Sequence, residues 1–258
     1  MKTKLALVIA ATLTSTTVLA NNTADVNMFM TSDSEVTVFQ QSPNEGNTAE
    51  IKSYFVGNDS ALSISQVGGT NDAKILAVEV DHGDFSIDQT GDLNKALIKT
   101  EPVFFDNYKD DVVSITQSGT DNNSEVLLKG GTDEANVELN VVGTLNETSV
   151  VLNMGDHSTV TGVVDGNSNM ADVYVDDSSD NTIAFEQTGD SNNIDVDVTG
   201  MSDNNNLDIT QTSSNAIANV AVYWGSTDNI INVTQTYGDV ANVNVGASTN
   251  NVVTVTQY

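Results

Sequence analysis

Residues 183–198 read Ile183-Ala184-Phe185-Glu186-Gln187-Thr188-Gly189-Asp190-Ser191-Asn192-Asn193-Ile194-Asp195-Val196-Asp197-Val198. Apolar and polar residues alternate on both sides of the segment 189–191. Strict alternation has the period of a β-strand with one buried and one exposed face. A segment of glycine, aspartate and serine suits a turn that needs positive φ angles. The stretch therefore predicts a strand, a tight turn and a second strand.

The same unit recurs along the chain, and this repeat decides the architecture. Aligned on Gln187, the units place an anchor residue every 22 to 28 positions, and nine of the ten residues two places before the anchor are apolar. The exception is Gly162. The anchors are Gln40, Gln66, Gln89, Gln117, Val141, Val164, Gln187, Gln211, Gln235 and Gln257.

Other residues recur at fixed distances from the anchor. Two positions after it, six central units carry the turn glycines Gly68, Gly91, Gly119, Gly143, Gly166 and Gly189. Five positions after it, the same units carry Asn71, Asn94, Asn122, Asn146, Asn169 and Asn192. Six positions before it, seven units carry Ser34, Ser60, Ser158, Asn181, Asn205, Asn229 and Asn251.

A two-strand unit of about 24 residues is too small to bury its own apolar face, so neighbouring units must stack. We expect equivalent strands to pair in parallel, about 4.8 Å apart, in two sheets that face each other. The predicted fold class is all-β: a two-sheet parallel β-solenoid of about ten strand-turn-strand repeats.

The glutamines and asparagines are in phase with the apolar residues, so they should point inward. A buried amide is costly unless its donors and acceptors are matched. Amides stacked at the rung spacing can bond to their equivalents above and below, as in amyloid. We therefore expect a structural amide ladder that breaks at Val141 and Val164, where an apolar stack replaces it.

The chain divides into three parts. Residues 1–20 have a positive start, an apolar stretch over 5–11 and a small-residue end, which predicts a cleaved export signal. Residues 21–33 form a polar leader, interpreted either as a disordered segment or as a secretion-targeting tag. Residues 34–258 hold the repeats, with an insertion at 101–111 that favours a surface loop over a partner contact.

Composition excludes several functions. Removing residues 1–20 leaves 6 lysines, no arginine and 36 acids, a net charge of −30. Nucleic acids and anionic membranes both require basic surface, so neither is an expected partner. Cysteine is absent, so an exported chain would have no disulfide to stabilise it.

The chemistry-bearing residues are sparse. His82 and His157 lie in turn-like contexts, the lysines are scattered, and the acids fall on outward positions or turns. We therefore predict no enzyme activity, no cofactor and no metal site. The alternative is an acidic calcium-binding β-roll or adhesin, because turns such as 176–181 offer oxygen ligands. The glycine-rich nonapeptide repeat of calcium β-rolls is missing, however.

The chain ends in an expected strand over 253–258 with no cap behind it. Soluble solenoids usually carry polar terminal caps, and an open parallel edge offers backbone groups to another chain. We therefore expect the protein to associate with itself, end to end.

The pattern over 34–258 resembles the curlin repeat of curli fibre subunits. Ser60 to Ala73 fits it throughout, and Gln89 to Ala96 and Val164 to Ala171 follow it closely. The resemblance implies a secreted subunit of extracellular functional amyloid in a biofilm matrix, with roles in adhesion. It also implies a nucleator subunit and an outer-membrane secretion pore as partners, and leaves open whether this chain is the main subunit or the nucleator.

The chain departs from the family pattern at one repeated position. Curlin repeats usually carry a second glutamine eleven residues after the first. This chain has other residues there, so we expect hydrophobic stacking to replace one amide ladder at this position. The residues here are Ala77, Thr100, Leu128, Leu152, Val175 and Val198.

Overall fold

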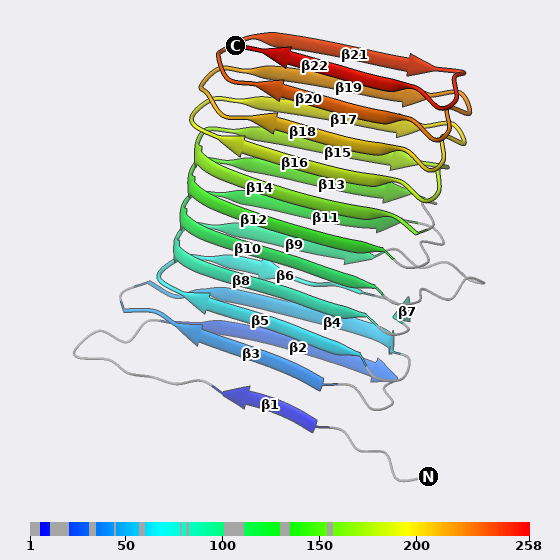
Figure 1. Cartoon of the computed structure of the whole chain (residues 1–258). Helices are drawn as coiled ribbons and strands as arrows, with labels where there is room; N and C mark the ends of the chain where they lie inside the picture. Colours follow the sequence, from blue (N-terminus) through cyan, green and yellow to red (C-terminus); the bar gives the residue numbers. More distant parts are fainter. Residues whose placement is uncertain are drawn as a thin grey trace.

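A computed structural model describes residues 6–10, 21–30, 35–43, 45–56, 60–77, 79–80, 83–100, 111–129, 135–153 and 157–258. Within these residues the secondary structure is entirely β, and no helix is long and apolar enough to span a bilayer. The strands stack as rungs in two layers along one axis, with β1 (Ala6–Ala10) and β22 (Val252–Gln257) at opposite ends (Figure 1).

The first sheet alternates along the chain with the second. In the described residues it consists of β1 (Ala6–Ala10), β3 (Glu35–Gln41), β5 (Ala61–Val67), β8 (Asp84–Asp92), β10 (Val112–Thr120), β12 (Asn136–Thr144), β14 (Thr159–Asn167), β16 (Thr182–Thr188), β18 (Asn206–Gln211), β20 (Ile230–Gln235) and β22 (Val252–Gln257). Neighbours in this order are hydrogen-bonded to each other.

The second sheet has the same arrangement. It consists of β2 (Thr23–Met30), β4 (Thr48–Val56), β6 (Asp72–Lys74), β9 (Lys95–Thr100), β11 (Asn123–Lys129), β13 (Glu147–Asn153), β15 (Met170–Asp176), β17 (Asn193–Thr199), β19 (Ile217–Tyr223) and β21 (Val240–Gly246), and the short β7 (Glu79–Val80) pairs with β4. The predicted all-β, two-sheet parallel solenoid is confirmed.

All strand pairs are parallel, and the register follows the repeat. Gln40 pairs with Gln66, and each later anchor pairs with the next through to Gln257. Because side chains alternate between the two faces, a slip of one residue would expose the whole apolar row. The hydrophobic pattern therefore fixes the register.

The core lies between the sheets. In β17, Ile194, Val196 and Val198 are buried, whereas Asp195 and Asp197 are exposed. The residue eleven positions after the anchor is buried in all six central units, so the second ladder position is packed inside the solenoid.

Gly162 is the one residue two positions before an anchor that is not apolar, and sterics explain it. Gly162 pairs with Phe185 on the next strand, and a Cβ at Gly162 would overlap the Phe185 ring. The aromatic ring thus occupies the volume that two neighbouring aliphatic side chains fill elsewhere. A glycine is needed here for space and not for a special backbone angle.

Two segments outside the predicted repeats form strands. Residues 23–30 lie in the leader, yet they form β2, which pairs with β4 from Thr23↔Thr48 onwards. Residues 6–10 lie in the predicted export signal and form β1, which pairs with β3. Of the predicted insertion at 101–111, only Asp111 is described, and it is buried.

Candidate functional site: side-chain ladders and end faces

The anchor glutamines form two hydrogen-bonded columns. Each Nε2 donates to the Oε1 of the next glutamine along the chain, at 2.8 Å for Gln66 to Gln89 and at 2.9 Å for Gln211 to Gln235. The same bond joins Gln40 to Gln66, Gln89 to Gln117, Gln187 to Gln211 and Gln235 to Gln257. Each column therefore has a direction, with donors facing the C-terminal end.

The second Nε2 proton of each glutamine ties the two sheets together. Gln66 donates to the carbonyl of Thr48, the first residue of β4, at 3.0 Å. Gln211 donates in the same way to Asn193, the first residue of β17, at 3.0 Å. A buried amide whose groups are all bonded avoids the cost of desolvation. The glutamines thus connect rungs along the axis and sheets across it.

The columns stop at Val141 and Val164, which are both fully buried. Below the gap, Gln117 donates instead to the Ser124 hydroxyl at 2.8 Å. Above it, the buried Oε1 of Gln187 has no hydrogen-bond partner. The gap therefore leaves one unsatisfied acceptor inside the solenoid, at the level where a glutamine would have supplied the donor.

The six predicted asparagines are all buried and stack at the turn from the first sheet to the second. Their bonding is mostly to backbone. The Oδ1 of Asn71 accepts the backbone N–H of Asn94 at 3.0 Å, and the Nδ2 of Asn94 donates to the carbonyl of Gly119 at 3.0 Å. Direct amide contacts also occur, as from Asn122 to Asn94 at 3.1 Å. The asparagines thus act mainly as turn clamps.

This asparagine column is longer than the repeat alignment indicated. Asn22 and Asn47 extend it toward the N-terminus, because the Asn47 backbone N–H donates to the Asn22 Oδ1 at 2.9 Å and Asn71 bonds to Asn47 likewise at 3.0 Å. It ends where the Ala216 N–H bonds to Asn192. The signal for Asn22 and Asn47 was present in the sequence, since each lies just before a strand of the second sheet.

A second asparagine column occupies the opposite turn. Asn181, Asn205, Asn229 and Asn251 are joined by bonds of backbone N–H and Nδ2 to the preceding Oδ1. The sequence showed this position as a recurrent Ser or Asn, but its role as a ladder was not predicted. The second column therefore begins close to the rung at which the first one ends, and it clamps one turn of the later rungs.

The turn glycines are required by both backbone angle and space. All six adopt positive φ, between +108° and +139°. At Gly119, a Cβ would overlap the carbonyl oxygen of Gly143 on the next rung. Any larger residue would therefore push adjacent rungs apart.

The outer face of the second sheet carries stacked carboxylates. Asp172 pairs in register with Asp195, and Asp197 lies two residues along the same strand. Although Asp195 and Asp197 are exposed overall, neighbouring rungs partly bury their carboxyls, and this partial burial, and then repulsion from Asp172, raises the pKa of Asp195. Burial, and then repulsion from Asp195 and Asp172, raises the pKa of Asp197. Parallel stacking thus brings like charges together, which opposes folding at neutral pH.

The histidines and carboxylates of the described residues are dispersed. They contain no group of three or more His, Asp or Glu side chains that could hold a metal ion. His157 lies 3.5 Å from the Asp180 carboxylate, and both side chains are about half exposed. His82 lies outside the described residues.

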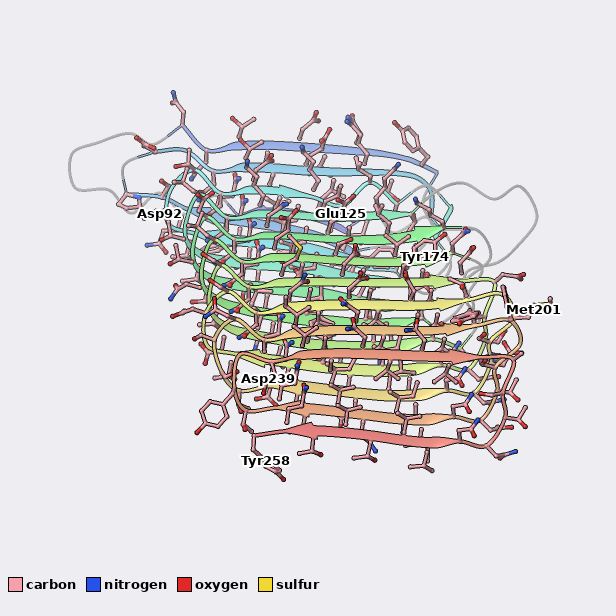
Figure 2. All side chains as sticks on the ribbon, turned by 90° about the horizontal axis from the view of Figure 1, so that it is seen from above. Asp92, Glu125, Tyr174, Met201, Asp239 and Tyr258 are labelled. Atoms are coloured by element: carbon pink, nitrogen blue, oxygen red, sulfur yellow. The ribbon has the colours of Figure 1, made fainter. Side chains whose placement is uncertain are left out.

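In the described part of the chain, β22 is an edge strand of the first sheet. β22 bonds to β20 on one side, and the described residues place no strand on its other side. Val253 and Val255 pack against the core while remaining partly exposed, and Tyr258 is 84% exposed. Figure 2 shows Tyr258 at the outermost rung of the stack.

Comparison with known proteins assigns no family to the chain. No protein-family model matches it, and no curated protein is significantly similar to it. The fold is that of a β-solenoid, an architecture compatible with a repetitive structural or adhesin-like module.

Proposed function

We propose that this protein is a structural subunit of secreted, curli-like amyloid fibres and that it polymerises by end-to-end stacking. The observation that carries the proposal is the edge strand β22, which has one hydrogen-bonded neighbour strand, β20, in the described part of the chain. An open parallel edge presents unpaired N–H and C=O groups to another strand. Nothing in the described residues blocks that edge with a helix or a polar cap.

The interior of the solenoid supports the same proposal. Stacked glutamine amides and interdigitated aliphatic residues are the interactions that stabilise cross-β fibres. Here they already run along the axis within a single chain, from Gln187 to Gln257 without a break. A fibre would extend this arrangement with no new type of contact.

The remaining parts of the proposal rest on the sequence. Residues 1–20 predict export, and the curlin resemblance suggests an outer-membrane pore and a nucleator subunit as partners, with a role in biofilm matrix and adhesion. We propose a purely structural role without catalysis, cofactor, nucleic-acid binding or binding to anionic membranes. Whether this chain is the main subunit or the nucleator depends on seeding, which the following experiment includes.

The test is fibre formation by purified residues 21–258 in the presence of a chelator. We expect thioflavin-positive fibres, with diffraction spacings of about 4.8 Å along the axis and about 10 Å between sheets. Preformed fragments should shorten the lag before growth. A chain that stays monomeric at high concentration, or that folds only after calcium is added, would contradict the proposal and favour the calcium β-roll.

A further inference from the structure

The two sheets of the exported chain contain matching numbers of strands only if β2 is included. Without β1, which lies in the predicted signal, the first sheet keeps ten strands, β3 to β22, among the described residues. Along its main path, the second sheet also has ten described strands, β2 to β21. A chain whose leader stayed outside the solenoid would have nine, so each junction in a stacked fibre would lack one strand.

We propose that residues 21–30 form part of the junction between two copies: β2 pairs with β21 of the preceding copy, while β3 pairs with its β22. This inference rests on the proposed function. It assigns a structural role to the leader in place of a targeting tag. The partner is a second copy of this chain, and its docking surface is the face formed by β21 and β22.

The leader is bonded as a rung of the solenoid. The Thr23 N–H donates to the Asn47 carbonyl at 2.8 Å, and Gln40 Nε2 donates to the Thr23 carbonyl at 3.1 Å. Asn22 begins the asparagine column through its bond to Asn47. These are the same contacts that fix the internal rungs carrying an anchor glutamine and a turn asparagine, so the segment is integrated into the fold.

The C-terminal face is suited to dock on another copy because it lacks charge. Residues 240–258 contain no charged side chain, in a chain with 36 acidic residues. The face presents a row of aliphatic and amide groups that is only partly covered, including Val253 and Val255. Because this face carries no carboxylate side chain, acids of β2 and β3 such as Asp25 meet no like-charged side chain across the junction.

The repeat register specifies the contacts. If the column of anchor residues continues into the next copy, Gln257 pairs with Gln40 of that copy, and Thr254 therefore pairs with its Thr37. The direction of the ladder is complementary, since Nε2 groups face the C-terminal end and Gln40 presents Oε1 at the other. In the second sheet, Asn242 of one copy faces Asp25 of the next.

In the uncleaved chain, β1 already occupies the edge of β3 with which β22 of another copy would pair. β1 pairs in parallel with β3, with Leu7 opposite Val36 and Ile9 opposite Val38. Val253 and Val255 of another copy would take the same two places. Removal of residues 1–20 therefore opens the N-terminal face, and a chain that retains them is capped there.

The test uses disulfide trapping, because the natural chain has no cysteine. Residues 21–258 carrying Thr37→Cys and Thr254→Cys probe the first sheet, and Asp25→Cys with Asn242→Cys probes the second. Across a junction, each pair would lie about 4.8 Å apart, within reach of a disulfide. Within one copy, the members of each pair lie at opposite ends of a rod of about 45 Å, so only bonds between copies can form.

The matched control is Thr37→Cys with Thr256→Cys, which shifts one partner by two residues on the same face. Its Cα atoms would be about 8 Å apart, beyond the disulfide range. We expect mild oxidation of fibres to convert both matched pairs into covalent multimers on a non-reducing gel and to leave the control monomeric.

The outcomes separate this inference from the proposed function. Fibres in which only the first-sheet pair cross-links would show that the leader is outside the junction and would overturn the inference, while the fibre proposal would stand. Equal cross-linking of the shifted control would overturn the proposed register. Absence of fibres from the unsubstituted chain would remove the proposed function itself. As a second measurement, a small fraction of the 1–258 chain should slow elongation of 21–258, because it can add to a fibre but blocks the next addition.

Discussion

The glutamine column makes a quantitative prediction about one substitution, Gln211→Leu. Gln211 accepts from Gln187 at 3.1 Å and donates to Gln235 at 2.9 Å and to the Asn193 carbonyl at 3.0 Å. Leucine is more apolar and similar in size, so burial alone would favour it. The substitution nevertheless leaves a buried N–H of Gln187 and the buried Oε1 of Gln235 without partners.

Each buried polar group left unsatisfied costs about 1–3 kcal/mol. Two such groups cost about 2–6 kcal/mol together, and the added apolar burial offsets about 1–2 kcal/mol, so the expected net loss is about 2.5 kcal/mol in the free energy of unfolding. The matched control is Gln257→Leu at the open end of the same column. There Gln235 Nε2 keeps its bonds to Ile217 and Asp239, so we expect a loss of about 1 kcal/mol or less.

The assay is urea unfolding of residues 21–258 at low concentration, followed by far-ultraviolet circular dichroism. Equal destabilisation by the two substitutions, or a Gln211→Leu variant as stable as the natural chain, would refute the assignment of stability to the ladder. A reciprocal test fills the gap with Val141→Gln and Val164→Gln together. The double variant gains three Nε2–Oε1 hydrogen bonds, which should raise the free energy of unfolding by about 2 kcal/mol after the cost of burying the amides. Either single substitution leaves a newly buried amide group without a partner, so it should give no gain in stability.

Three other expectations concern turns, pH and salt. Gly143→Ala should destabilise the fold by more than about 2 kcal/mol, because its φ is +121° and the added Cβ overlaps the Gly166 carbonyl. The control is Gly225→Ala, whose added Cβ has its nearest contact at 3.9 Å and which should cost about 1 kcal/mol in the same unfolding assay. The raised pKa values of Asp195 and Asp197 mean that the fold favours the protonated carboxyls, so stability should be greatest below their ordinary pKa of 3.8 and fall as pH rises through the raised values. Replacing both with asparagine should flatten that dependence in a pH series of unfolding midpoints, and an unchanged slope would contradict the cause. Added salt or divalent cations should shorten the lag of thioflavin-detected assembly by screening outward acids, and a longer lag at high salt would contradict this.

The sequence by itself determined the fold class, the register and the inward rows. Alternation at period two and a recurring anchor are local properties, and a parallel stack is the arrangement that buries every repeat at once. The pairing of Gln40 with Gln66, and so on to Gln257, follows directly from the alignment. The glycine position of the turn was also visible, because positive φ has a compositional signature.

Only the tertiary structure decided how the polar groups are satisfied and where the solenoid begins. Three features depend on positions in three dimensions. They are the direction of the bonds between glutamines, the bond that each second Nε2 proton makes to the opposite sheet, and the unpartnered Oε1 of Gln187. The leader has no anchor glutamine, so the repeat did not identify it, although Asn22 places β2 in register with β4. A segment joins a stacked fold when a neighbouring strand leaves an edge with which it can pair. The available edges depend on the assembled rungs and cannot be identified from one segment alone.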